Sequence, residues 1–162
     1  ETKYELAISN SVLNSINIKQ TGQGIHQALP LIIRTYMDEI DPTLIIIEEP
    51  ETHLHPAAHG NLAQRLVDSF LENSNKNYLI ETHSQNFVLR MRRLVAEGKL
   101  EPKDIKIYYV DFDKDENVSN LVDIIVNKDG SVEKWPEGVF GETVLEARAI
   151  MNANINDLRN VD

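Results

Sequence analysis

A run of four aliphatic residues, Leu44–Ile47, that ends in the carboxylates Glu48 and Glu49 constrains the fold of this chain more than any other segment. Continuous Leu, Ile or Val is typical of a buried strand in a parallel sheet, and ligands of such sheets bind just beyond the carboxyl ends of the strands. Because side chains alternate along an extended chain, one carboxylate can face a magnesium ion while the other faces a nucleophilic water. The alternative is an acidic loop after a core strand, and the strand-end position argues against it.

The remaining periodic segments predict an α/β fold with a partial parallel sheet flanked by helices. Strand, helix, strand, helix, strand is the order of parallel neighbours whose connecting helices cover the sheet. The helix that contains Pro30 should begin close to it, because proline is tolerated only in the first turn. We expect strands at Leu44–Ile47, Asn77–Glu81 and Ile105–Val110, and helices at Ala28–Met37, Pro56–Leu71 and Phe87–Ala96.

The C-terminal segment predicts a hairpin and a helix. Asn-Lys-Asp-Gly at Asn127–Gly130 is a strong hairpin-turn signal between the apolar segments Leu121–Val126 and Val132–Trp135. The tail over Thr143–Ile155 is expected to be helical. An antiparallel addition should therefore follow the parallel sheet.

The composition excludes several classes of protein. Hydrophobic residues make up 41% and charged residues 26% of the 162 residues, as in a globular domain that buries a core. The longest aliphatic run is too short to cross a membrane, so we expect a soluble cytoplasmic protein without a membrane partner. Because the chain has no cysteine, disulfides, thiolate metal sites and cysteine nucleophiles are excluded.

The net charge of −10 disfavours binding of this chain alone to a nucleic-acid backbone. A local basic cluster at Arg90, Arg92 and Arg93 can approach a phosphate or pair with nearby acids. We favour ordinary surface ion pairing, which is the usual role of such clusters.

Two further segments bring phosphate-binding and catalytic residue types next to the strand ends. Gly22 and Gly24 precede a helix, where backbone amides and the helix dipole can bind an anion, although glycines there more often serve tight turns. His83 follows the second strand, and a neutral imidazole there can donate to a phosphate oxygen or to an attacking water. Neighbouring strands that both end in polar residues are what a nucleotide site at a sheet edge requires.

A transition-metal site is one alternative for the histidine-rich segment after Glu49. Imidazole and carboxylate groups are zinc ligands, but no further pair completes a known spacing. We prefer histidines that form interface and backbone hydrogen bonds. The residues concerned are Glu51, His53, His55 and His59.

A metal-dependent nuclease is a second alternative. The acidic segment Asp111–Glu116 fails the EF-hand pattern, because it lacks the turn glycine and the terminal glutamate. Asp111 and Asp113 can still be the carboxylates of a two-metal nuclease, although a solvated acidic loop is the commoner outcome.

No Gly-x-x-x-x-Gly-Lys-Ser/Thr loop, which cradles nucleotide phosphates, begins at any of the seven glycines. The first residue is Glu1, and the segment after it resembles the interior of a domain. We expect the chain to be a fragment or the second half of a larger protein.

Three motifs, taken in order, carry a resemblance to a known family. They are Gly-x-Gly-x-x-Gln at 22–27, Ile-Ile-Glu-Glu-Pro-Glu-Thr-His-Leu-His-Pro at 46–56 and Ile-Glu-Thr-His-Ser at 80–84. Over residues 20–142 the chain resembles the C-terminal half of an ABC/SMC-like AAA ATPase with a P-loop NTPase-like fold. More narrowly, it resembles bacterial ATPases related to the OLD proteins, in the subgroup with a C-terminal domain of unknown function. The resemblance assigns residues 1–110 to the ATPase domain and residues 111–162 to a hairpin and helix extension.

The resemblance implies that the first two motif carboxylates form the Walker B end of the site. Glu48 would hold Mg²⁺, Glu49 would be the general base, and His83 would be the switch histidine that senses the γ-phosphate. The usual Walker B aspartate is replaced by Glu48, which is one methylene longer.

The resemblance also implies two loops that face a second protomer. Gly22, Gly24 and Gln27 would lie in the signature loop, which binds the γ-phosphate held by the other protomer. His53 and His55 would reach the cofactor from the dimer-facing D-loop. The signature lacks its usual leucine-serine opening, and with it the contact normally made by that serine hydroxyl.

The function implied is a bacterial ATPase that binds ATP and Mg²⁺ and acts as an ATP-driven dimer switch. Expected partners are a Walker A-bearing N-terminal half of the same protein, a second copy through ATP, and DNA or a nuclease through the full protein. DNA processing or antiphage defence is the process implied, and the isolated chain should be inactive. Two other functions are left open: an interaction module that completes another polypeptide's ATP site, and the nuclease with Asp111 and Asp113.

Overall fold

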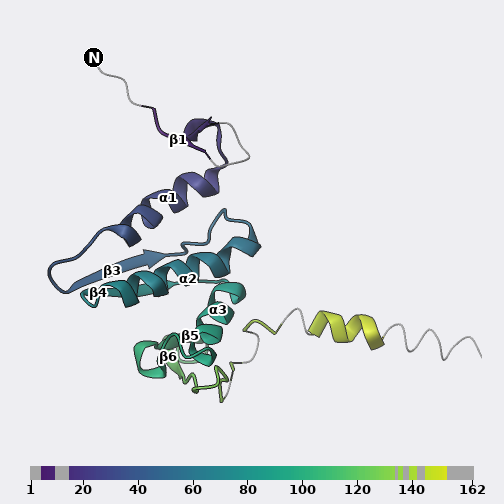
Figure 1. The fold of residues 1–162 in the computed structure, drawn as a ribbon. Coiled ribbons are helices and arrows are strands. Elements are labelled where there is room, and N and C mark those ends of the chain that lie inside the picture. Colours follow the sequence, from purple (N-terminus) through teal and green to yellow (C-terminus); the bar gives the residue numbers. More distant parts are fainter. Residues whose placement is uncertain (1–4, 10–14, 134, 137–138, 142–144, 153–162) are drawn as a thin grey trace, which may run out of the picture.

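The computed structural model describes residues 5–9, 15–133, 135–136, 139–141 and 145–152. The fold is mixed α/β, as predicted, and is compatible with a P-loop NTPase-like fold (Figure 1). In chain order the elements are β1 (Ala7–Ile8), β2 (Ile16–Asn17), the 3₁₀ helix η1 (Ile18–Gln20), α1 (Gln23–Tyr36), β3 (Thr43–Glu48), α2 (Pro56–Glu72), β4 (Lys76–Glu81), α3 (Gln85–Ala96), the 3₁₀ helix η2 (Pro102–Asp104), β5 (Ile107–Asp113) and β6 (Val118–Ile124).

The parallel sheet consists of β3 and β4, joined by the crossover helix α2. The strands pair in register along their whole length, and Glu48 lies opposite Glu81 at the carboxyl end. Helices pack on one face only, so alternate residues of β3 are open to solvent: Leu44 is 58% and Ile46 is 65% exposed. The prediction of a buried strand is therefore wrong for one face of β3, because among the described residues no second layer covers the face with Leu44 and Ile46.

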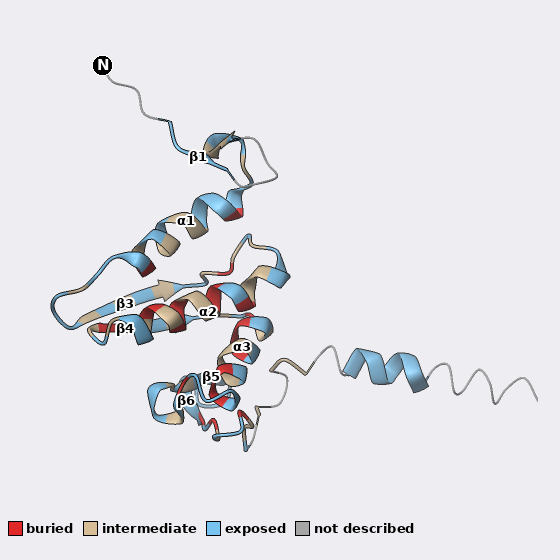
Figure 2. Ribbon diagram, viewed as in Figure 1, coloured by how far each residue is buried: buried red, intermediate tan, exposed pale blue. Residues whose placement is uncertain are grey.

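Two apolar clusters meet along α2, which Figure 2 shows as the element richest in buried residues together with α3. The first joins α2 to α3 and to the sheet, and its buried members are Leu62, Ala63, Leu66 and Phe87. The second joins the C-terminal half of α2 to α3 and to the segments that follow, and its buried members are Val67, Leu94, Val95, Leu100 and Val126. Both clusters contain residues of α2 and α3, so these two helices are held together along their length and support the strands that carry the site.

Side chains and glycine set the helix ends near the sheet edge. His55 caps α2, because its Nδ1 accepts a hydrogen bond from the Ala57 amide at 3.2 Å, and Pro56 follows in the first turn. Ser84 caps α3 by accepting from the Phe87 amide at 3.1 Å. Gly98, with φ +69°, follows the end of α3 in the left-handed conformation that glycine adopts readily.

The position of Pro30 differs from the prediction. Helix α1 begins at Gln23, directly after its N-cap Gly22, so Pro30 lies in the helix interior rather than in the first turn. Proline cannot donate to the carbonyl four residues earlier, and that residue is His26. The helix nevertheless continues to Tyr36, because its apolar face packs on the cluster around α2.

The third predicted strand belongs to a different sheet. β5 does not extend the parallel sheet, and it pairs with β6 in an antiparallel hairpin from Ile107 opposite Ile124 to Asp113 opposite Val118. The cause is local, because Asp113 Oδ1 accepts from the amides of Asp115 and Glu116 at 2.8 and 3.1 Å and closes a tight turn. The next segment therefore folds back onto β5 directly.

The predicted turn at residues 127–130 is present, but among the described residues the antiparallel pairing around it is short. The Gly130 amide donates to the Asn127 carbonyl at 2.8 Å, and a single bridge joins Val126 to Val132. Residues 121–124 pair with β5 instead.

Residues 145–152 are helical, inside the range predicted for the C-terminal helix, and residues 143–144 and 153–155 lie outside the described residues. Among the helices of the described part, none is both long and apolar enough to span a membrane.

Candidate functional site at the carboxyl edge of the parallel sheet

The chain leaves β3 through a tight turn that begins at Glu49. The Glu49 amide donates to the Glu81 carbonyl oxygen at 2.9 Å, so the pairing with β4 continues one residue beyond β3. Glu49 has φ +42°, in the left-handed region, where the chain turns out of the sheet. The Thr52 amide closes this turn by donating to the Glu49 carbonyl at 3.0 Å.

Glu49 and His83, the two predicted catalytic residues, face each other across this edge. Glu49 Oε1 lies 3.2 Å from His83 Nε2. The other oxygen, Glu49 Oε2, accepts a hydrogen bond from Thr52 Oγ1 at 2.9 Å. The side chains are 47% and 76% exposed, so a water or a phosphate oxygen can reach both.

A third carboxylate, Glu81, lies at the same corner. One ligand atom each from Glu49, Glu81 and His83 falls within 4.8 Å of the other two. The predicted magnesium ligand, Glu48, is opposite Glu81 in the strand register and exposed, and it is not a member of this group. The edge therefore presents several oxygen donors to solvent, together with one imidazole.

Gly24, predicted for the signature loop, packs against the loop that follows Glu49. A Cβ at Gly24 would come within 2.3 Å of the carbonyl oxygen of His53 and 3.2 Å of Leu54 Cδ2. His53 has φ +66°, and this strained backbone turns its carbonyl toward α1. The start of α1 and the loop of residues 50–56 are thus in direct contact within one chain.

Gly22 and Gln27, the other two signature candidates, are both exposed. Gly22 caps α1 through its backbone only, and nothing lies within 4 Å of the position of a Cβ there. Within the described part of the chain, no hydrogen bond or ion pair joins either residue to Glu49 or His83.

The histidines of the loop serve different purposes. His55 caps α2, and His59 bonds to the Leu54 carbonyl at 3.1 Å and to Ser84 Oγ at 2.7 Å. His53 is exposed. The interpretation of these residues as structural hydrogen-bonding groups is confirmed for His55 and His59, and in the described ranges no metal-type group contains them or Glu51.

Comparison with protein families decides the class of the chain. The model of the AAA ATPase domain family matches residues 2–88, more than half of the 162 residues, and this range includes the whole edge described above. The chain belongs to the AAA ATPase domain family. Residues 100–149 match a second family, described as a protein of unknown function (DUF3696). No curated protein and no solved structure matches the chain.

ATP and Mg²⁺ are the ligands that AAA ATPases generally bind, and the donor set of the edge fits the metal. Mg²⁺ takes oxygen ligands from one or two carboxylates together with water and phosphate. Glu48, Glu49 and Glu81 supply such carboxylates at adjacent strand ends of this AAA ATPase domain. No phosphate-cradling loop of the Gly-x-x-x-x-Gly-Lys-Ser/Thr type occurs in the 162 residues.

Sequence inspection assigned no role in the site to two of its residues. Glu81 is the last residue of β4. The parallel pairing of β3 with β4, which places Glu81 opposite Glu48, is the observation that could have identified it. Glu51, considered only as a metal ligand, is buried and bonds to Thr82 and to the backbone of His83. Its position in the motif at residues 46–56, three residues after Glu48, could have drawn attention to it, but only the fold shows which groups Glu51 contacts.

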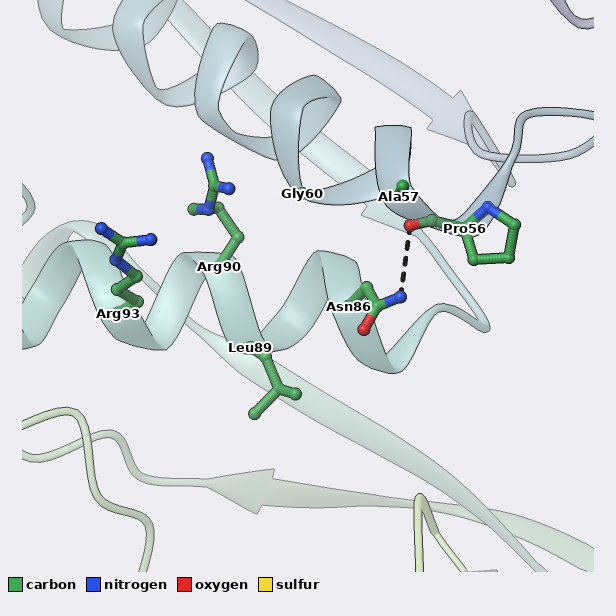
Figure 3. Close-up of a pocket in the computed structure, with 7 residues that line it drawn as sticks. All are labelled: Pro56, Ala57, Gly60, Asn86, Leu89, Arg90 and Arg93. Atoms are coloured by element: carbon green, nitrogen blue, oxygen red, sulfur yellow. Dashed lines mark hydrogen bonds between the residues drawn. The ribbon is translucent and has the colours of Figure 1, made fainter. Parts of the chain in front are cut away.

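Two members of the basic cluster of α3, Arg90 and Arg93, line a shallow hollow of about 320 Å³ between α3 and the first turns of α2 (Figure 3). Arg93 pairs with Glu97 at 2.6 Å, which confirms the predicted surface ion pairing for this residue. Arg92 Nε donates to the Gly130 carbonyl at 2.8 Å and thereby holds the turn at residues 127–130. Arg90 reaches over Gly60 of α2, with Nη2 3.2 Å from the position of a Cβ there.

The two aspartates proposed for a nuclease do not share a site. Asp113 closes the β5–β6 turn through its side chain, and Asp111 lies in β5 opposite Asn120. Within the described ranges, neither belongs to a group of metal-type side chains. The solvated acidic turn, the commoner outcome, describes this segment.

Proposed function

We propose that this chain supplies the water-activating edge of an ABC/SMC-like P-loop ATPase and hydrolyses ATP together with a Walker A-bearing segment. The observation that carries the proposal is the 3.2 Å approach of Glu49 Oε1 to His83 Nε2 at the carboxyl edge of a parallel sheet. Nucleotides of open α/β sheets bind at this edge. The match to the AAA ATPase domain family supports the same reaction.

Glu49 would act as the general base. A carboxylate can accept the proton of a water that attacks the γ-phosphate in line. Thr52 Oγ1, which donates to Glu49 Oε2, fixes one oxygen and leaves the other directed toward His83. His83 would hold a γ-phosphate oxygen or the attacking water through Nε2.

Glu48 would hold Mg²⁺, with Glu81 beside it in the strand register. The ion, when bound, neutralises charge on the phosphates. The residues of this chain would orient the water and receive its proton, and the phosphates would be held by the Walker A loop.

The contact between Gly24 and His53 supports a second part of the proposal. The signature residues Gly22, Gly24 and Gln27 and the loop that carries His53 and His55 would form one surface that faces the nucleotide of a second protomer. ATP would then join two copies of the full protein, and hydrolysis would release them.

The wider context of the proposal rests on the sequence resemblance. The chain would be the C-terminal half of an ATPase related to the OLD proteins, and DNA processing or antiphage defence would be the process driven, through DNA or a nuclease partner of the full protein. The segment matched as DUF3696 would adapt the ATPase to that partner.

The decisive experiment uses the complete protein, in which a Walker A loop is present. Glu49→Gln should retain ATP binding and lose turnover, because the amide cannot accept the proton. Asp111→Asn is the matched control, because it neutralises a carboxylate outside the site, and it should turn over ATP at the wild-type rate. Normal turnover by Glu49→Gln would refute the base assignment.

A second arm separates the remaining alternatives. The chain alone should hydrolyse no ATP, and addition of the N-terminal half should restore turnover. Restored ATP binding without turnover would favour an interaction module instead. Plasmid cleavage with manganese that is lost in Asp113→Ala and kept in Glu49→Gln would favour a nuclease.

A further inference from the structure

Glu51 spans the gap between the loops that follow β3 and β4. Its side chain is buried, with 7% of the residue exposed. Glu51 Oε1 accepts a hydrogen bond from Thr82 Oγ1 at 2.6 Å and another from the backbone amide of His83 at 2.8 Å. One carboxylate oxygen therefore holds two consecutive residues of the neighbouring loop.

The burial of this carboxylate is costly, which argues for a specific purpose. The second oxygen, Glu51 Oε2, is also buried and has no hydrogen-bond partner in the described part of the protein. Most buried polar atoms are paired, and an unpaired one costs about 1–3 kcal/mol.

His83 is the residue that needs such a support. Its side chain is 76% exposed and meets Glu49 only at 3.2 Å, so little packing fixes the ring. The backbone of His83 is held through the hydrogen bond to Glu51, two residues beyond Glu49 in the same turn. A shift of this backbone would change the distance between Glu49 and His83.

We infer that Glu51 is the positioning residue of the site, and that it fixes His83 against Glu49 by holding the His83 amide. This inference rests on the proposed function. Because misplacement of a reacting group by about 1 Å can cost a hundredfold in rate, loss of this support should lower kcat by about 10-fold or more. The affinity for ATP should change little, because Glu51 is itself buried and bonds only to the Thr82 hydroxyl and the His83 amide.

The kinetic test uses four versions of the complete protein in a double-mutant cycle: wild type, Glu51→Ala, His83→Ala and the double variant. If Glu51 acts through His83, Glu51→Ala should lower kcat in the wild-type background and have no further effect in the His83→Ala background. Equal losses of kcat in both backgrounds would overturn the inference, since a purely structural defect does not depend on His83.

Conservative variants refine the kinetic test. Glu51→Gln keeps an acceptor oxygen and should retain kcat within about 3-fold, because a neutral amide oxygen can accept both hydrogen bonds. Thr82→Val removes the hydroxyl that donates to Glu51 and accepts from the Ser84 amide at 3.1 Å, but it leaves the His83 amide bonded to Glu51, so it is the matched control and should retain turnover. A loss in Thr82→Val as large as that in Glu51→Ala would assign the effect to Thr82 and overturn the role of the His83 amide.

A readout without ATPase activity keeps the inference separate from the proposed function. Amide hydrogen exchange at His83 should accelerate about 10-fold or more in Glu51→Ala, because the amide loses its acceptor. Glu81→Gln, at the same corner, should leave the exchange rate of His83 unchanged. Unchanged exchange in Glu51→Ala would overturn the inference, whereas changed exchange in a protein that hydrolyses no ATP would overturn only the proposed function.

Discussion

Gly24 lies directly against the backbone of His53, so close that a Cβ on Gly24 would come within 2.3 Å of the His53 carbonyl oxygen. Backbone atoms cannot yield as the end of a flexible side chain can, so any residue larger than glycine must push α1 away from the loop of residues 50–56. The contact joins the predicted signature glycine to a loop that begins immediately after Glu49.

Gly24→Ala should therefore destabilise the protein, although alanine is the better helix former. We expect the free energy of unfolding to fall by about 1–3 kcal/mol, as for other overpacked sites. Urea unfolding followed by circular dichroism measures this change. Gly22→Ala is the matched control, because a Cβ at Gly22 meets nothing within 4 Å, and it should cost less than about 1 kcal/mol. Equal effects of the two substitutions would contradict the close contact.

The sequence was sufficient to predict the elements around the site. The aliphatic run of β3 and the apolar periodicity of α2 and α3 are strong local signals, and the structure has each of these elements within two residues of the predicted bounds. The approach of Glu49 to His83 also follows from local signals, because the carboxyl ends of neighbouring parallel strands lie at the same edge.

Strand pairing and backbone packing were not predictable in the same way. The pairing of β5 with β6 depends on a turn closed by Asp113. In the sequence, the Asn-Lys-Asp-Gly pattern at residues 127–130 indicates a hairpin turn more strongly than the residues of that turn do. The interior position of Pro30 depends on tertiary packing of α1, which overrides the local preference. The hydrogen bonds of Glu51 join segments about 30 residues apart, so no local pattern indicates them.

Ser69 is the centre of a buried polar network, and its removal should be costly. Its hydroxyl donates to the Thr35 carbonyl at 2.7 Å and accepts from Lys76 Nζ at 3.0 Å, and it lies 2.8 Å from the Tyr78 hydroxyl. Because the single hydroxyl proton goes to Thr35, Tyr78 must be the donor in the last contact. Ser69 is fully buried, so its hydroxyl has no access to water.

Ser69→Ala should lower the free energy of unfolding by about 1–3 kcal/mol, because the Tyr78 hydroxyl and one N–H of Lys76 Nζ lose their acceptor, while Lys76 keeps its hydrogen bond to the Thr35 carbonyl. Denaturant unfolding of the variant measures the loss. Ser74→Ala, in the exposed turn after α2, should change the free energy by less than about 0.5 kcal/mol. A loss no larger than that of the control would show that water or another group replaces the Ser69 hydroxyl.

Stability should decrease on acidification through two surface ion pairs. A hydrogen bond from Arg65 lowers the pKa of Glu72, and one from Arg34 lowers the pKa of Glu39. A carboxyl group with a lowered pKa in the folded state binds fewer protons there than in the unfolded chain. The stabilisation is therefore present above the unfolded pKa and is lost as the pH falls through the folded pKa.

The measurement is the melting temperature between neutral and acidic pH at low and high salt. Glu72→Gln should flatten the decline on acidification, and salt should reduce the difference between variant and wild type, because the pair is near the surface. Glu116→Gln, which removes a carboxylate without an ion pair among the described residues, should leave the pH profile unchanged. A steeper decline in Glu72→Gln would contradict the direction of the pKa shift.

His59 joins the loop after β3 to the start of α3 through both of its ring nitrogens. His59 Nε2 lies 3.1 Å from the Leu54 carbonyl oxygen. Because a carbonyl oxygen can only accept, Nε2 carries a proton and donates this hydrogen bond. In the neutral ring Nδ1 is then the acceptor, and the Ser84 hydroxyl donates to it at 2.7 Å while accepting from the Phe87 amide. The imidazole thus links the N-cap of α3, next to His83, to the loop that packs on Gly24.

His59→Ala should lower the free energy of unfolding by about 1–3 kcal/mol, because the partly buried Leu54 carbonyl and Ser84 hydroxyl lose their partners. Urea unfolding measures this loss, and Asn61→Ala, at an exposed position of the same helix, should change stability by less than about 0.7 kcal/mol in the stabilising direction. Amide exchange gives a local readout, since the segment 54–59 and the first turn of α3 should lose protection together. Loss of protection in only one of the two segments would show that His59 does not couple them.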